Sequence, residues 1–352
     1  MRARRSRPLR ARRAILACAL LGSAAARGQP GETTAEGALY VRTDTDSTTV
    51  VAPRAHVRHE LAGVKTGIDV VYTADVWTSA SVDIRTAATE RVTEQRDELN
   101  LGLDRALADD HARIGIAYRF SHEPDFLSHA VALRGAYETP SRNTTLDARV
   151  FASVDAIGRA EDALFEERAT GVGAWLGLSQ LLDRDTVLQL AYELRARLGY
   201  QASPYRFVAL DSPGLCTPAA TWCVPEVLPR ARHRNAWVVG LRRALHRRVS
   251  LGASYRFYVD TWALRSHTPL VDLAVSPARD VWLWLRYRGY FQSGASFYRA
   301  RYQLGDDLRF VTRDRELSSM FSHRAELVLR YQRALGDRGA RALSLGALLG
   351  GA

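Results

Sequence analysis

The chain has 352 residues, of which 47% are hydrophobic and 25% are charged, a composition that excludes a disordered, collagen-like or low-complexity chain. The formal net charge of +11 falls to +4 once the seven arginines of residues 1–26 are set aside, and Lys65 is the only lysine. Charges of both signs are mixed along the rest of the chain, so its charge does not call for a nucleic-acid partner.

Residues 1–26 carry the features of a secretory signal peptide in the usual order. A basic stretch precedes the apolar segment AILACALLGSAAA, which ends in the small residues of a cleavage site and is too short to span a membrane. A lipoprotein box at Cys18 would leave almost no apolar core ahead of it, and a twin-arginine signal at Arg12 and Arg13 lacks polar flanks. No run of about 18 apolar residues follows residue 27. We therefore expect an exported protein without a transmembrane helix.

The dominant pattern of the remaining chain has a period of two residues. In the segment 111–122, the even positions from Ala112 to Phe120 are apolar, whereas Arg113 and Arg119 stand among the odd positions. Successive side chains of a strand point to opposite faces, so this alternation predicts one apolar and one polar face. The alternating segments are about 10–15 residues long, whereas strands of soluble proteins average about five or six. A membrane-crossing strand needs roughly 9–11 residues, so these lengths favour transmembrane strands over a soluble β-sandwich or solenoid.

Fourteen strands are predicted in the mature chain. They lie near 37–44, 48–61, 65–79, 97–107, 111–121, 126–138, 143–156, 169–182, 185–202, 232–244, 249–260, 263–275, 280–292 and 318–333. Short turns alternate with longer connections, as in outer-membrane barrels with tight periplasmic turns and longer extracellular loops. The tail 339–350 fits badly, because a fifteenth strand breaks the even strand number of bacterial barrels, so twelve or sixteen strands stay open. The predicted fold is all-β, an antiparallel transmembrane up-and-down β-barrel of about 14 strands that occupies 27–352 as a single domain.

Four segments carry a resemblance to a known family. They read SASVDIRTAATERVTEQRDELNLGLD at 79–104, SHEPDFLSH at 121–129, VDAIGRAED at 154–162 and TRDRELSSMFSH at 312–323. Together they resemble the domain-of-unknown-function family 3570, a bacterial family of predicted outer-membrane β-barrels. The likeness covers most of the mature chain. It implies the same barrel and brings no catalytic assignment.

Motifs that indicate catalysis or metal binding are missing from the sequence. The nine histidines are scattered, with no H-E-x-x-H spacing and no Cys/His cluster, and we expect them in turns or in the lumen. Ser121, His122, Glu123 and Asp125 cluster in one extracellular turn, where a polar cap that orders the loop is a simpler interpretation than a catalytic set. A TonB-type receptor needs about 22 strands and a plug, for which the chain is too short. We predict no catalytic residue, no bound metal and no cofactor.

The second face of the predicted strands is the most informative feature for function, because it collects charged residues. The inward-facing set that we expect to line the lumen is Arg54, Arg58, Asp75, Arg113, Arg149, Glu193, Arg195, Arg197, Arg256, Arg288 and Glu326. A polar interior around water is typical of porins and favours a porin-like passage for small hydrophilic solutes, with weak anion preference. The alternative is a closed structural or partner-docking barrel held by an ion-pair lattice across the strands. An outer-membrane enzyme is a third and less favoured hypothesis.

The opposite face is predicted to contact outer-membrane lipid. Side chains expected in hydrocarbon are Ile114, Ile116, Leu188, Leu190, Leu251 and Leu327, and those expected near the interfaces are Tyr118, Phe120, Tyr137, Trp237, Phe257, Tyr287, Phe291 and Tyr331. The predicted location is the outer membrane of a Gram-negative bacterium, reached by signal-peptide export. Lipid and small solutes are the expected partners, nucleic acid is not, and the sequence does not define an oligomeric state.

Cys216 and Cys223 are predicted to form a disulfide. Cys18 leaves with the signal peptide, so the mature chain holds only these two thiols, both within the connection 203–231. Exported proteins meet oxidising conditions, in which paired cysteines usually bridge. A metal site would need further ligands, and the one nearby histidine has an unsuitable spacing. Two free thiols stay open as an alternative, since Pro218 can hold the chain in an unsuitable turn. The bridge would stiffen a loop above the barrel mouth.

Overall fold

The structure is a computed structural model. It describes residues 16–17, 31, 33–43, 49–79, 92–107, 110–160, 162–211, 216, 222–335 and 341–351. These residues are mostly β-strand, and one connection among them contains a short 3-10 turn, η1 (Arg315–Leu317). None of the helices in this part of the chain is long and apolar enough to cross a membrane.

A single antiparallel sheet contains all of the long strands, and each pairs with the next long strand in the sequence. The strands are β2 (Thr33–Thr43), β3 (Thr49–Leu61), β4 (Thr66–Ser79), β5 (Val92–Leu107), β6 (Ala112–Glu123), β7 (Phe126–Glu138), β8 (Thr144–Ile157), β9 (Glu167–Asp183), β10 (Thr186–Gly199), β13 (Ala231–His246), β14 (Val249–Asp260), β15 (Arg265–Ala278), β16 (Val281–Gln292), β17 (Met320–Leu335) and β18 (Arg341–Gly351). Each of the fourteen predicted strands is confirmed, with ends that differ by a few residues. The tail that fitted badly forms β18, which pairs with β17.

Three short strands complete the described secondary structure. The two-residue strand β1 (Leu16–Ala17) pairs with β2. Apart from β1, the predicted signal peptide lies outside the described residues. The connection after β10 holds a separate hairpin made of β11 (Phe207–Ala209) and β12 (Cys223–Pro225).

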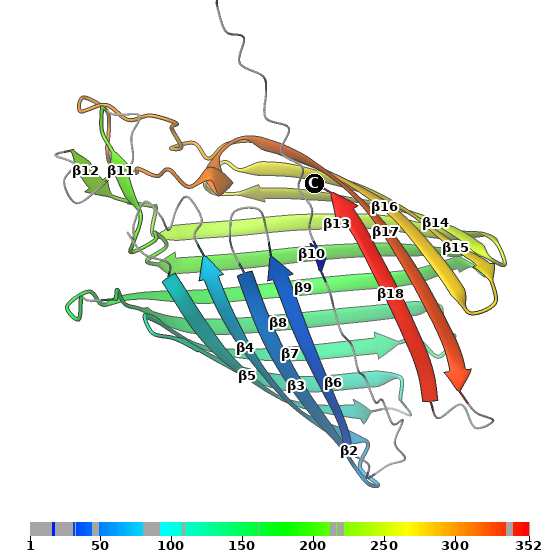
Figure 1. Cartoon of the computed structure of the whole chain (residues 1–352). Helices are drawn as coiled ribbons and strands as arrows, with labels where there is room; N and C mark the ends of the chain where they lie inside the picture. Colours follow the sequence, from blue (N-terminus) through cyan, green and yellow to red (C-terminus); the bar gives the residue numbers. More distant parts are fainter. Residues whose placement is uncertain are drawn as a thin grey trace, which may run out of the picture.

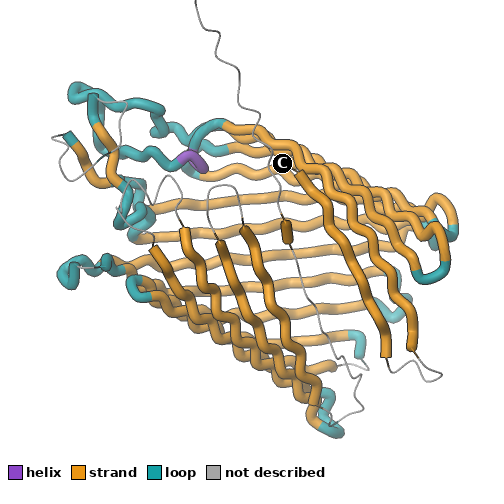
Figure 2. Tube along the Cα trace, in the orientation of Figure 1, coloured by secondary structure: helices purple, strands orange, loops and turns teal. Residues whose placement is uncertain are grey.

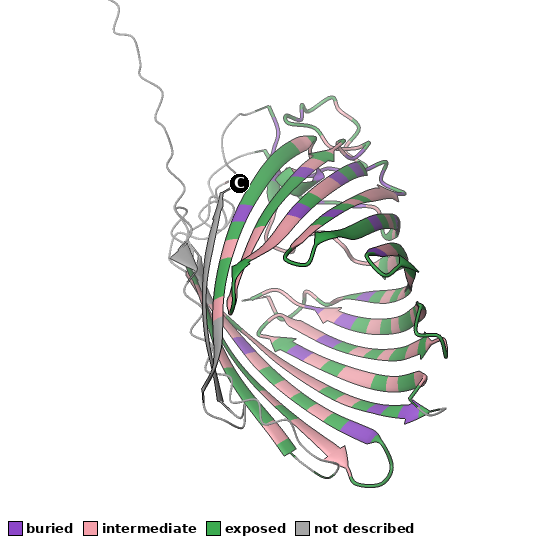
Figure 3. Cartoon of the chain, turned by 90° about the vertical axis from the view of Figure 1, so that its right-hand side faces the viewer, coloured by how far each residue is buried: buried purple, intermediate pink, exposed green. Residues whose placement is uncertain are grey.

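The sheet curls, and its first and last long strands return to the same side of the molecule (Figure 1). Figure 3 shows the same curvature from a second direction. Within the described residues no ladder joins β18 to β1 or β2, so hydrogen bonds do not close the sheet there. The structure therefore establishes a strongly curved, all-β antiparallel sheet, and closure into a barrel stays a prediction.

The register divides the sheet into two chemically different faces. Ladder partners lie on the same side, so Arg58 of β3, Asp69 of β4 and Gly102 of β5 share one face. When the same rule is applied to each successive pair of strands, all the residues that were predicted to face inward lie on that face. Large apolar side chains occupy the other face and stay exposed, for example Ile114 and Leu285, each 52% exposed. An apolar face of this extent indicates contact with another apolar phase or surface.

The connections differ at the two ends of the strands. At one end, short turns join neighbouring strands, and Asp110 and Asp280 adopt left-handed φ angles of 72° and 67°. Aspartate tolerates this conformation because its short side chain can bond to the local backbone. The other end, on the left in Figure 2, carries the long connections 158–166, 200–230 and 293–319. The predicted alternation holds for these connections, whereas the β6–β7 connection, 124–125, is a two-residue turn at the same end, and 261–264 is also short.

We call the described parts of 158–166, 200–230, 261–264 and 293–319 the loop assembly. It has two small hydrophobic cores, formed by Leu228, Trp262, Leu264, Ala295 and Leu317 and by Val208, Leu210, Tyr302 and Val311. Isolated backbone bridges also join the connection 200–230 to the connection 293–319. Because segments far apart in the sequence share these cores, the loop assembly is packed as one unit.

Candidate functional site

Asp104 of β5 is the point at which arginines from three other strands meet. Its side chain is only 2% exposed. The carboxylate accepts hydrogen bonds from Nη1 of Arg58 at 2.9 Å and from Nη2 of Arg134 at 3.3 Å, and Arg113 donates a third. Hydrogen bonds between charged partners are stronger than neutral ones. Asp104 therefore links strands from β3 to β7 through one buried carboxylate.

Two glycines make the room that these arginines need. Gly67 and Gly115 are the direct ladder partners of Asp104 on its two neighbouring strands. A Cβ added to Gly67 would lie 2.1 Å from Nη2 of Arg58, and one added to Gly115 would lie 2.7 Å from Nε of Arg134. The absence of side chains at these positions lets the guanidinium groups approach the backbone closely on their way to Asp104.

Several ion pairs on the charged face skip a strand. Arg58 and Asp104, for example, are separated by β4. The pattern recurs in Arg197 with Asp155 at 3.0 Å, Arg242 with Asp272 at 2.6 Å and Arg256 with Glu193 at 3.6 Å. Alternate strands of a flat sheet are about 10 Å apart, and curvature brings their side chains together on the inner side only. The charged face is therefore the concave one.

Further ion pairs join neighbouring strands or nearby residues of one strand. They include Arg58 with Asp69 and Glu60, Arg96 with Asp75, Arg119 with Glu98, Arg232 with Asp260, Arg286 with Glu326, Arg195 with Glu193 and Arg324 with Glu326. Together with the pairs that skip a strand, they form an ion-pair lattice over the described concave face. This lattice uses most of the carboxylates on that face but not all of the arginines.

A hollow of about 950 Å³ lies beside this lattice on the concave face. Charged residues that line it are Arg58, Arg113, Arg119, Arg134, Arg149, Arg195, Asp104, Asp147 and Glu193. Arg149 has no hydrogen bond or ion pair with the rest of the described chain. Arginines outnumber acids around the hollow, so its electrostatic potential favours anions.

The sequence-predicted inward set is brought to one face, but its members have different surroundings. Most of them belong to the ion-pair lattice described above. Arg54 and Arg149 form no ion pair within the described residues, and Arg288 lies 5.6 Å from the ring centroid of Tyr290. That this face lines a lumen stays a prediction.

Three histidines lie on the apolar face, where the sequence did not predict them. His129, His267 and His323 lie on the apolar face, and each shares a hydrogen bond between its Nδ1 and a tyrosine hydroxyl of the preceding strand. The Oη–Nδ1 distance is 2.7 Å for both Tyr118 with His129 and Tyr287 with His323. The expectation that histidines lie in turns or in the lumen is wrong for these three and, by the same register, for His59, His122 and His233. Each is separated by an even number of residues from the apolar residues of its strand, and this spacing in the sequence could have identified its face.

The polar cluster near the β6–β7 turn is divided between the two faces. Ser121 and His122 are consecutive residues of β6, so their side chains point to opposite faces. Asp125 accepts a hydrogen bond from the Tyr205 hydroxyl, and its backbone carbonyl accepts one from the Gly158 amide at 2.7 Å. The structure thus brings Asp125 together with the loop assembly and does not bring Ser121 together with His122.

Two groups of polar contacts, around Tyr205 and around Glu226, fix the loop assembly. The Tyr205 hydroxyl accepts a hydrogen bond from the Ala160 amide at 2.6 Å, and its burial and its bond to Asp125 raise the pKa of Tyr205 to about 12. The fully buried Glu226 carboxylate accepts hydrogen bonds from Nη1 of Arg206 at 3.1 Å and from the Thr312 hydroxyl at 2.5 Å. These contacts join four connections that are separate in the sequence.

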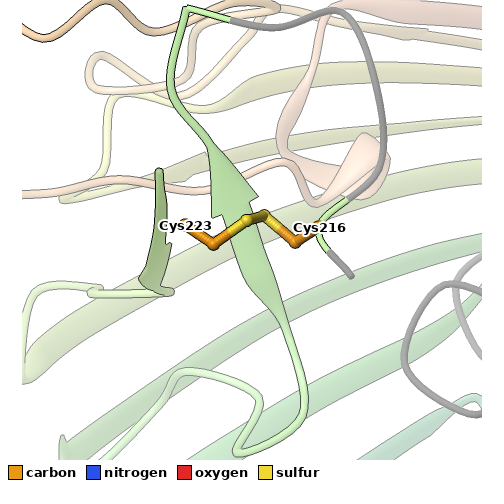
Figure 4. The surroundings of a disulfide bond; sticks show 2 residues. All are labelled: Cys216 and Cys223. Atoms are coloured by element: carbon orange, nitrogen blue, oxygen red, sulfur yellow. A yellow bond between two sulfur atoms is a disulfide. The ribbon is translucent and has the colours of Figure 1, made fainter. Parts of the chain in front are cut away.

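The predicted disulfide between Cys216 and Cys223 is confirmed, with the two Cα atoms 5.8 Å apart (Figure 4). Cys223 is the first residue of β12, so the bridge closes a short ring on the β11–β12 hairpin. Among the residues that the structure describes, no group of three or more His, Cys, Asp or Glu side chains is arranged to hold a metal ion.

The chain is similar to a known protein family and to an import receptor of known structure. A family model described as "Protein of unknown function (DUF3570)" matches residues 158–334. No curated protein matches the chain. Among solved structures, the open form of the ferric-catecholate import receptor Fiu from E. coli K12 is similar, with a TM-score of 0.49 and 8% sequence identity. The match covers 96% of this chain and 63% of that chain, so this chain spans less than two thirds of the receptor's length.

Proposed function

We propose that this chain, which belongs to the protein family of unknown function DUF3570, is an outer-membrane β-barrel that passes small hydrophilic solutes. In this proposal residues 1–26 direct export, the curved sheet closes, the charged concave face lines the lumen and the apolar face contacts lipid. One observation carries the proposal. Charged side chains surround a hollow of about 950 Å³ on the concave face, whereas exposed apolar side chains cover the other face. This sorting is typical of water-filled barrels in outer membranes.

The spacing of polar and aromatic residues on the apolar face supports a membrane position. His129 and Tyr137 of β7 are eight residues apart on this face, and the same spacing separates His323 and Tyr331 of β17. Eight residues extend about 27 Å along a strand, or about 21 Å along the membrane normal at a tilt of about 40°. Apolar bands of outer-membrane barrels are about 25 Å tall and lie between aromatic girdles. The tyrosine–histidine pairs then form the girdle nearer to the loop assembly.

The number of strands supports an open lumen. Barrels of about eight strands are just wide enough to be filled by side chains, whereas those of about 16–18 strands leave an aqueous channel. With fifteen long strands in the described sheet, its strand number is close to the wide end of that series. Side chains of the ion-pair lattice then line the lumen without filling it.

The second candidate is a closed structural or partner-docking barrel, and the ion-pair lattice is the observation that favours it. Pairs such as Arg58 with Asp104 tie alternate strands together, and the loop assembly packs over one end. A lattice of this kind stiffens a barrel whether or not solutes pass. Neither candidate requires a catalytic group, and we propose no enzymatic activity.

A liposome-swelling assay tests the proposed passage. Purified mature protein is reconstituted into liposomes, which are then diluted into isotonic solutions of neutral sugars of increasing size. We expect swelling rates that fall steeply with sugar size, because a lumen of fixed width sieves uncharged solutes. Protein-free liposomes are the control. Folded, reconstituted protein that gives no swelling with the smallest sugar would reject the passage and leave the closed barrel.

A further inference from the structure

Arg195 of β10 and Arg234 of β13 are direct ladder partners on the concave face, near the loop assembly. Arg197 and Arg232 form the next same-face ladder pair toward the loops. Like charges that face each other directly destabilise a sheet. Two successive arginine pairs therefore require negative charge close by.

Three carboxylates of this region are already engaged by other arginines, whereas Glu123, which lines a hollow beside Arg234, forms no ion pair within the described residues. Asp260 pairs with Arg232 at 2.6 Å, Asp155 pairs with Arg197 at 3.0 Å, and Glu193 pairs with both Arg195 and Arg256. Asp260 is also held in place by three other donors, which are the Tyr258 hydroxyl and the amides of Trp262 and Leu264. It is therefore not free to turn toward another arginine.

Arg234 is the arginine of this region that has no ion-pair partner among the described residues. Its Nε is buried without a hydrogen-bond partner, and no ion pair to Arg234 occurs within the described residues. Five arginines and four carboxylates in this region, Glu123 included, leave one positive charge without a neutralising partner. A buried donor without a partner is costly, so an anion from outside the described chain that reached the Nε of Arg234 would stabilise this site.

Two hollows of about 260 and 290 Å³ flank these arginines, and both Arg195 and Arg234 line each of them. The hydroxyl-bearing residues Ser121, Ser128 and Ser153 also line the first hollow. Each hollow far exceeds the volume of about 10–15 Å³ that one water requires. Each therefore has room for a small anionic group next to the guanidinium groups.

We propose that Arg195 and Arg234 bind a small oxyanion, a phosphate or carboxylate group of a solute, at the loop end of the concave face. A guanidinium offers two parallel N–H donors that match the paired oxygens of such a group. Small oxyanions are then a class of solute for the proposed passage. The site rests on that proposed function only because the solute would reach it through the lumen. An anion bound between Arg195 and Arg234 neutralises the facing charges.

Equilibrium dialysis tests the site directly, with inorganic phosphate and, separately, citrate as probes for protein in an uncharged detergent at constant sodium chloride. We expect saturable binding of at least one probe and at least tenfold weaker binding by Arg234→Gln. Arg234→Lys keeps the charge but loses the planar pair of donors, so its loss is expected to be smaller. Arg184→Gln removes one exposed arginine from the β9–β10 turn and is expected to leave binding unchanged.

Thermal unfolding separates a lost site from a lost fold. Without phosphate, Arg234→Gln is expected to unfold at the same temperature as the wild type or higher, because it removes a like charge. Saturating ligand raises the unfolding temperature of a protein that binds it, so phosphate or citrate stabilises the wild type and not Arg234→Gln. No binding by the wild type, or equal binding by Arg234→Gln, would overturn the site. If the protein binds the anion but gives no liposome swelling, the proposed passage is rejected and the anion site stands. If it gives swelling but binds no anion, the anion site alone is rejected.

Discussion

Arg58 of β3 extends past the whole of β4 to donate a hydrogen bond of 2.9 Å from its Nη1 to Oδ1 of Asp104 on β5. Because the Asp104 side chain is almost fully buried, this contact fixes the spacing of three strands on the concave face. The same carboxylate receives Arg113 and Arg134 from the far side. Asp104 therefore joins three arginines in this part of the sheet, where Arg58 also pairs with Asp69 and Glu60.

Replacement of that residue is expected to destabilise the fold. Asp104→Asn removes the negative charge that three arginines share, and hydrogen bonds to charged groups contribute about 1.5–3 kcal/mol each. Arg113 and Arg134 are about half exposed and regain water, so we expect a loss of about 2–3 kcal/mol. Urea unfolding in lipid vesicles, followed by tryptophan fluorescence, measures it.

Asp147→Asn is the matched control for this experiment. Asp147 lies on the same face and lines the large hollow, but it has no hydrogen bond or ion pair with other described residues. Its replacement is expected to change the unfolding free energy by less than about 0.5 kcal/mol. Equal losses for the two variants would show that Asp104 does not have the linking role described.

The two faces of the sheet predict opposite responses to a new arginine. Leu190 is 40% exposed on the apolar face, whereas its neighbour Gln189 lies on the concave face near Gly240. Leu190→Arg is expected to cost roughly 2–4 kcal/mol, because it places a charge in hydrocarbon, and Gln189→Arg is expected to cost little. The free energy of unfolding from vesicles compares them. Similar costs at the two positions would contradict the assignment of the apolar face to lipid.

The faces of the strands could be predicted from the sequence because they depend on parity alone. Arg113 and Ile114 are consecutive residues of β6, so a strand must send them to opposite faces whatever the rest of the chain does. Length and turn positions then defined fourteen strands. The disulfide was also predictable, because Cys216 and Cys223 are the only cysteines outside the predicted signal peptide.

Contacts that depend on three-dimensional packing could not be predicted in this way. The pairing of Arg58 with Asp104 requires curvature and the absence of a side chain at Gly67, neither of which alternation reveals. The bridge between Val227 and Val311 joins two irregular connections that have no periodic pattern. The lack of an ion pair at Arg234 appears only from the three-dimensional contacts, in which Asp155, Glu193 and Asp260 pair with other arginines.

The anchoring of the loop assembly is expected to depend on pH through Tyr205. Its pKa is raised from the usual 10 to about 12, so its contribution to stability is fully present below pH 10 and is lost as the pH rises through about 12. Tyrosinate absorbance measures the titration, and the difference between the wild type and Tyr205→Phe isolates this residue. A difference curve with its midpoint near pH 10 would contradict the partly buried hydrogen bond from Tyr205 to Asp125.

Ion selectivity is expected to follow the unpaired arginines of the concave face. Arg149 lines the large hollow and has no ion-pair partner among the described residues, so Arg149→Glu changes the charge without breaking a pair. We expect weak anion preference in the wild type and a shift toward cations in this variant, since lumen charges set the sign of selectivity. Reversal potentials across a salt gradient measure it. A shift of the same size in Arg184→Gln, which alters the exposed β9–β10 turn, would show that the effect is not local to the lumen.

Single-channel recording in planar lipid bilayers tests the central claim most directly, namely that the charged concave face lines an open, water-filled lumen. Purified mature protein is expected to insert in discrete steps of uniform conductance that increase with salt concentration. Protein that is folded and inserted in the bilayer, yet conducts no ions at any salt concentration, would contradict the open lumen and identify the ion-pair lattice as the interior of a closed barrel.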